Sequence, residues 1–251
     1  MYSQLKYQIT LMMRTPRAVI FGVVAPALLL ALQSNHRHAS AATVAGLTVF
    51  GMLNLAYLTH TAGLVLSRED GVLRRWYASP LPRWQYFAGR ILSATLLTDA
   101  AALVLLLVGA AMGGLHLTGA AVGCVLIAAT LGGITLATAG TALTPLLPPG
   151  QGVYQILALT YLPLLLFAGG LGGIGGLPHW LTTLNSYLPV QPVVNAATQA
   201  LQHSALIPGR DLLVLAAWAA GSLLLATKFF RWDPTRPAHA RRRTTSTTAR
   251  S

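Results

Sequence analysis

Acidic residues are almost absent from this sequence, and charged residues of either sign are few. Only five of the 251 residues are aspartate or glutamate, and charged side chains make up 9% of the chain, against roughly a quarter in soluble domains. So few charges cannot cover the surface of a globular protein in water. Because 54% of the residues are hydrophobic, we expect lipid to surround most of the chain.

Cysteine and lysine are also scarce. The single cysteine, Cys124, excludes a disulfide within the chain and a cysteine-based metal site. The only lysines are Lys6 and Lys228, and neither follows a glycine-rich loop of the kind that binds nucleotide phosphates. We therefore expect no catalytic site, cofactor or metal in this chain. If ATP and magnesium drive the protein, another polypeptide must bind them.

Long apolar runs dominate what is present. The first, residues 18–32, is short for a bilayer, so we expect its helix to extend back through Thr15 to Arg17 or to lie in thinned membrane. Pro163 predicts a kink in the fifth. The sequence predicts an all-α polytopic membrane protein with six transmembrane helices in one domain, residues 1–232. The expected spans are residues 18–32, 42–66, 91–112, 120–147, 153–170 and 212–230.

The distribution of basic residues predicts how these helices are oriented. Fifteen lysines and arginines lie in the N-terminal segment, the segment 67–90 and the C-terminal tail, whereas the opposite loops hold two, Arg37 and Arg210. This bias predicts that the protein lies in the plasma membrane with both termini in the cytoplasm. The net charge of +12 is then explained by basic residues at the ends of the spans, and we expect no nucleic-acid partner.

The two ends of the chain differ from the spans. Tyr2, Leu5, Ile9 and Met12 recur at helical spacing, which predicts an amphipathic helix over residues 1–16 lying in the membrane interface, with a frayed terminus as the alternative. Residues 233–251 are rich in proline, threonine and arginine and have no apolar face. We expect a disordered basic cytoplasmic tail, which either binds anionic lipid or only reinforces the topology.

The segment between the second and third spans carries seven of the 22 charged residues. Asp70 can cap a short helix that ends before Pro80, and Pro82 can begin the next helix. Apolar and basic side chains lie on different sides of that short helix, which is what a membrane subunit offers to a soluble one. The residues expected to contact such a partner are Glu69, Asp70, Gly71, Val72, Leu73, Arg74, Arg75, Trp76 and Tyr77.

Polar side chains occur within the second and third spans. Asp99 is the only acid inside a span, near mid-membrane by helical rise, where a charge costs about 2.5–3.5 kcal/mol. Asn54, Tyr57 and Thr61 share one face at α-helical spacing, with His60 beside them. All five are candidates to line a translocation path. The alternative is interhelical hydrogen bonding, with Asp99 protonated or bonded to a threonine at a helix contact.

Small residues line one side of the fourth span. Ala129, Gly133, Ala137 and Thr141 recur every four positions. Such a strip lets helix backbones approach closely, so we expect a helix contact there, either within one chain or across a dimer.

The order of these segments resembles the membrane permease of type-2 ABC exporters, in particular the drug-resistance permeases of actinobacteria. The resemblance is carried by the acid-glycine-hydrophobe segment 68–73 with Arg74–Arg75, the proline elbow 79–84, the Arg-Pro element 14–17, and two proline-containing segments, 177–181 and 188–190. It implies that residues 69–77 form a cytoplasmic coupling helix docked on an ATPase. It also implies short re-entrant outer helices between spans five and six. The residues expected there are Pro178, Trp180, Leu181 and Pro189.

The resemblance further implies partners and a substrate class. Two copies of an ABC ATPase would bind ATP and magnesium beneath a permease homodimer, or beneath a pair with a related chain. The substrate would be a hydrophobic or amphipathic small molecule, such as an antibiotic, exported from a bacterial cell. The glycine-rich run 169–176 and the pair Gln202–His203 depart from the family pattern, which leaves the substrate open. From the residues alone, an ion- or proton-coupled transporter that uses Asp99 remains an alternative.

Overall fold

The computed structural model describes residues 16–34, 40–69, 83–112, 115, 117–147, 152–168, 183, 185–203 and 209–229. Within these ranges the chain is almost entirely helical, and no residue lies in a strand. This confirms the all-α prediction. The interfacial helix expected at the N-terminus, the coupling helix expected between the second and third spans, and the basic tail lie outside the described residues, except at their edges.

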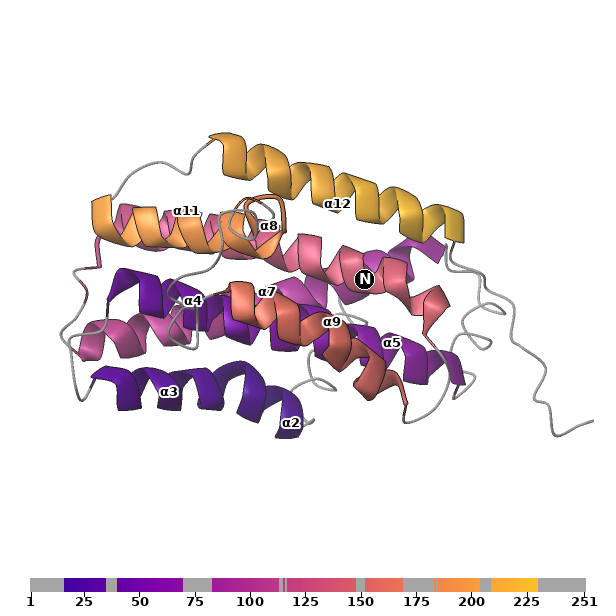
Figure 1. Ribbon diagram of the computed structural model, residues 1–251, viewed down its shortest axis with the longest axis horizontal. Coiled ribbons are helices and arrows are strands. Elements are labelled where there is room, and N and C mark those ends of the chain that lie inside the picture. Colours follow the sequence, from indigo (N-terminus) through magenta and orange to yellow (C-terminus); the bar gives the residue numbers. More distant parts are fainter. Residues whose placement is uncertain are drawn as a thin grey trace, which may run out of the picture.

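The helices follow one another along the chain, and two of them contain π-helical segments. The first helix consists of α2 (Pro16–Val19), η1 (Ile20–Val24) and α3 (Ala25–Ser34), and the second of α4 (Ala41–Met52), η2 (Leu53–Thr59) and α5 (His60–Glu69). Next come α7 (Arg83–Ala111), α8 (Gly119–Leu143) with the 3-10 turn η3 (Thr144–Leu146), α9 (Val153–Phe167), α11 (Val190–His203) and α12 (Gly209–Phe229). They run along the long axis, with α12 at one edge and α2 and α3 at the opposite edge (Figure 1).

Five helical stretches in the described residues are long and apolar enough to cross a membrane. They are Pro16–Gln33, Ala41–Arg68, Gln85–Ala111, Gly119–Leu146 and Gly209–Ala226. They correspond to the first four predicted spans and the last. The first begins at Pro16, so the short apolar run does extend backward. Over an 18-residue window of each span, 78% of the residues are buried in the second span, against 22% in the first and last, so the second span is central and those two are peripheral.

The predicted fifth span differs from the expectation. Instead of reaching Gly170, the helix α9 ends at Phe167, and Ala168 lies in a turn. Its 15 residues are about 22 Å long, short of a hydrocarbon core of about 30 Å. Figure 1 shows α9 along the half of the bundle where α5 ends and α11 along the other half. The two helices thus lie one after the other along the long axis of the bundle.

Hydroxyl side chains cap the helices that start after the loops. Ser40 accepts a hydrogen bond from the backbone N–H of Thr43 at 3.1 Å at the start of α4. Thr118 accepts one from Ala121 at 3.2 Å at the start of α8. Both caps satisfy a backbone donor that has no partner within the helix.

The helix α8 is the centre of the packing and contacts α7, α11, α12 and η2. Glycines permit these contacts. A Cβ atom on Gly133 would lie 2.7 Å from Oγ1 of Thr98 on α7, and one on Gly132 would lie 2.6 Å from Cγ2 of Val193 on α11. The small-residue strip therefore packs against helices of the same chain.

A second close crossing joins the first and second helices at their π-helical segments. Pro26 has no N–H to donate to the carbonyl of Gly22, and the helix is wide in η1, just before that proline. A Cβ on Gly51 would lie 2.5 Å from the backbone oxygen of Gly22. A Cβ on Gly22 would lie 2.6 Å from Cδ2 of Leu55. Glycine at both positions lets the two backbones touch.

Candidate functional site

Two polar residues of η2 bond to α9. The hydroxyl of Tyr57 lies 2.7 Å from Oγ1 of Thr160, and Tyr161 shares a hydrogen bond with Asn54. Asn54 and Tyr57 are both buried. A π-helical segment of this length is unusual and marks functional or strained positions. No proline or glycine lies between residues 52 and 62, so no helix-breaking residue accounts for it.

His60 and Thr61, which follow η2, contact α8 instead. The Nε2 atom of His60 is hydrogen-bonded to Oγ1 of Thr141 at 3.0 Å. Thr61 is completely buried, and a Cβ on Gly140 would collide with its Oγ1. That hydroxyl oxygen has no hydrogen-bond partner among the residues that the structure describes. We call Asn54, Tyr57, His60 and Thr61 the second-span cluster.

The single face expected for Asn54, Tyr57 and Thr61 is not found. The first two have partners on α9, whereas Thr61 lies against α8. The wider turns of η2, bonded i to i+5 in place of i to i+4, change the angular position of every residue that follows. The structure brings the four residues into one region but divides them between two neighbouring helices.

Asp99 lies apart from the second-span cluster. It is partly buried on α7, and its Oδ2 accepts a hydrogen bond from Oγ1 of Thr130 on α8 at 3.0 Å. Its Oδ1 is buried without a hydrogen-bond partner in the described part of the chain. Thr130 and Thr141 are three turns apart on one side of α8, about 16 Å. Polar contacts therefore follow one line along α8, from Asp99 to His60.

Sequence reasoning missed the hydroxyl partners of these residues. Thr130, Thr160 and Tyr161 were not singled out, and Thr141 was noted only for its small size. Each is a hydroxyl residue in an otherwise apolar run, which is the one signal that could have found them. In lipid such groups need partners within the protein.

The other candidate residues fall at the limits of the described chain. Glu69 ends α5, and residues 70–77, the rest of the expected coupling helix, lie outside the described ranges. Pro178, Trp180 and Leu181 also lie outside them. Pro189 is buried immediately before α11, which packs against α4 and α8 in the half of the bundle away from the end of α5.

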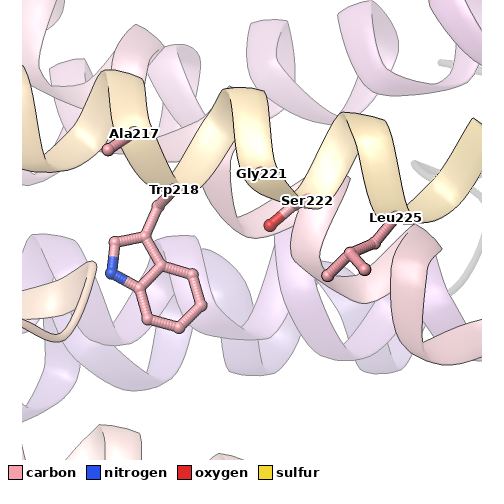
Figure 2. A pocket seen from close by; sticks show the side chains of 5 residues that line it. All are labelled: Ala217, Trp218, Gly221, Ser222 and Leu225. Atoms are coloured by element: carbon pink, nitrogen blue, oxygen red, sulfur yellow. The ribbon is translucent and has the colours of Figure 1, made fainter.

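A shallow pocket lies on α12, away from the polar line. Its volume is about 260 Å³, and all its lining residues come from α12: Ala217, Trp218, Gly221, Ser222 and Leu225. Figure 2 shows the Trp218 ring projecting from that helix beside the pocket. The indole N–H donates to the carbonyl of Tyr187 at 2.7 Å. No residue of the second-span cluster contributes to it.

Comparison with known proteins identifies the family. The family model described as ABC-2 type transporter matches residues 2–201, which include every helix from α2 to α9 and most of α11. No curated protein matches the chain significantly. The match covers well over half of the sequence and agrees with the bundle of apolar helices. The chain belongs to the ABC-2 type transporter family and is a multi-pass membrane permease of an ABC transporter.

Proposed function

We propose that this permease exports a hydrophobic or amphipathic small molecule, such as a drug or natural product, and that a separate ABC ATPase powers it. One observation carries the proposal. In a member of the ABC-2 type transporter family, polar contacts run along α8, buried at His60 and only partly buried at Asp99. Polar groups are costly in hydrocarbon, and in membrane transporters they mark substrate pathways.

The position of the segment 70–82 supports its role as the ATPase contact. It connects the end of α5 to the start of α7, and both lie at the same end of the bundle in Figure 1. That segment and its flanks carry Arg68, Arg74, Arg75, Arg83 and Arg90, and the positive-inside rule places it in the cytoplasm. Labelling position 76 from outside intact cells would contradict this topology.

Two copies of the permease would enclose a substrate path for which a single chain has no room. Thr61 and Gly140 pack so closely that no substrate fits between α5 and α8. Asp99 is only partly buried on α7. We therefore place the substrate path between two copies of the chain, with the α7–α8 side of each copy, and Asp99 on it, facing the path.

Transport into inside-out vesicles tests the function. The chain is co-expressed with an ABC ATPase that co-purifies with it, and uptake of daunorubicin, a fluorescent amphipathic amine, is followed with ATP, with a catalytically dead ATPase, or with an uncoupler. ATP-dependent uptake that the dead ATPase abolishes supports an exporter. Uptake that ignores ATP but collapses with the uncoupler supports the ion-coupled alternative. In the exporter, Asp99→Asn should reduce daunorubicin-stimulated ATP hydrolysis, while unchanged stimulation assigns Asp99 to helix packing.

A further inference from the structure

An arginine joins the two helices on either side of the segment 70–82. Arg90 lies on α7, and its Nη1 donates to Oγ of Ser67 at 3.1 Å and to the hydroxyl of Tyr86 at 3.2 Å. Its Nη2 reaches the backbone oxygen of His60 at 3.5 Å. The guanidinium carbon lies 5.9 Å from the centre of the Tyr86 ring. Ser67 and His60 belong to α5, so one side chain binds both helices.

Gly63 makes room for this guanidinium. A Cβ on Gly63 would lie 2.8 Å from Nη2 of Arg90 and meets no other atom within 4 Å. The hydroxyl of Ser67 donates to the carbonyl of Gly63 at 2.6 Å, which leaves its oxygen free to accept from Arg90. Gly63 and Ser67, four residues apart, form the site on α5 that binds the guanidinium. We call Arg90, Ser67, Tyr86, Gly63 and the His60 carbonyl the Arg90 cluster.

This geometry differs from that of an arginine that only marks the membrane boundary. Such a side chain extends along the helix toward water. The guanidinium of Arg90 instead lies across α5 and contacts residues up to nine positions before the end of that helix. Its Nε is buried without a hydrogen-bond partner in the described residues. Holding a partly buried charge with neutral groups alone has a cost, and a boundary role does not require that cost.

The Arg90 cluster connects to the polar line along α8. Arg90 holds the backbone of His60, and the ring of His60 is bonded to Thr141 on α8. We propose that Arg90 is a positioning residue for coupling. It holds α5 and α7 together as one body, so that a displacement of the segment between them reaches α8 through His60. This inference rests on the proposed function, because it takes the segment 70–82 as the ATPase contact.

Two variants disturb the Arg90 cluster in different ways. Arg90→Lys keeps the positive charge but loses the planar set of donors that binds several acceptors at once. Gly63→Ala leaves Arg90 intact and displaces only the far end of a flexible side chain, so the fold should survive. The matched controls are Arg17→Lys, an exposed arginine of α2, and Gly123→Ala, whose added Cβ meets nothing within 4 Å.

The measured quantity is daunorubicin transported per ATP hydrolysed, in vesicles that hold equal amounts of assembled complex. Both Arg90→Lys and Gly63→Ala should lower this ratio by about tenfold while ATP hydrolysis and co-purification of the ATPase persist. Both controls should keep the wild-type ratio. The inference is overturned if the two cluster variants keep the ratio within about twofold of wild type, or if transport falls only as the amount of complex falls.

A second measurement separates this inference from the proposed function. Spin labels at Leu66 on α5 and Gln85 on α7, in a chain carrying Cys124→Ala, report the distance between the two helices in lipid nanodiscs. A narrow distance distribution in the wild type should broaden in Arg90→Lys and in Gly63→Ala. If the wild type transports nothing, the proposed function fails and the label distances alone decide. An unchanged distribution in both variants overturns the role of Arg90.

Discussion

Replacing Gly51 by alanine should loosen the first helix from the bundle. The added Cβ would lie 2.5 Å from the backbone oxygen of Gly22, and a backbone atom cannot rotate aside as a side chain can. Overpacking of this kind costs about 1–3 kcal/mol. Alanine gains up to about 1 kcal/mol over glycine in a helix. The net change in the free energy of unfolding is therefore a loss of about 0–3 kcal/mol.

A matched substitution isolates the contact from the helix propensity. Gly123→Ala on α8 adds the same methyl group with no atom within 4 Å and should stabilise the protein by up to about 1 kcal/mol. The difference between the two variants is then the overpacking cost, about 1–3 kcal/mol. Unfolding by titration with sodium dodecyl sulfate in mixed micelles measures both. Equal stability of the two variants would refute the crossing of the first and second helices at Gly51 and Gly22.

Three further substitutions test the polar contacts and a cap by the same titration. Tyr57→Phe removes the hydroxyl bonded to Thr160 and should cost about 0.5–1.5 kcal/mol; no loss would mean that lipid or water replaces that bond. Thr141→Val leaves the buried ring of His60 without its partner and should cost about 1–3 kcal/mol, whereas a neutral result would argue against that pairing. Ser40→Ala removes the cap of α4 and should cost about 0.5–2 kcal/mol, and an unchanged midpoint would show that the cap adds nothing.

The length of apolar runs was enough to predict most of the fold. A bilayer demands about 20 consecutive apolar residues for a spanning helix, and the charged segments between the runs fix where each helix must end. Four spans follow directly from this rule, and the first follows once its short apolar run is extended back to Pro16. The same rule failed for the end of α9, because the apolar run continues past Phe167 while the helix does not. Hydropathy reports burial in lipid, and within an apolar run that continues without charge it does not show where the helix stops.

The candidate site could be predicted only in part. Polar residues in a span are conspicuous, so Asn54, Tyr57, His60 and Asp99 were found from the sequence. Their partners depend on which helices are neighbours and on the π-helical register of η2. No sequence pattern in residues 53–59 predicts a π-helix. Arg90 entered the sequence analysis only in the count of basic residues that predicts the topology. Its contacts were not predicted, because Ser67 and His60 lie 23 and 30 positions before it in the sequence.

The π-helical segment η2 separates the second span into two parts, α4 and α5. The orientation of the residues from His60 to Glu69 depends on the direction in which η2 ends. The part of the span before η2 is packed against the first helix at Gly51. Relaxation of η2 to ordinary α-helical bonding would screw α5 about its own axis, carrying Gly63 and Ser67 away from the guanidinium they hold. Such a change would act on α5, while the part of the span before η2 keeps its contacts with α11.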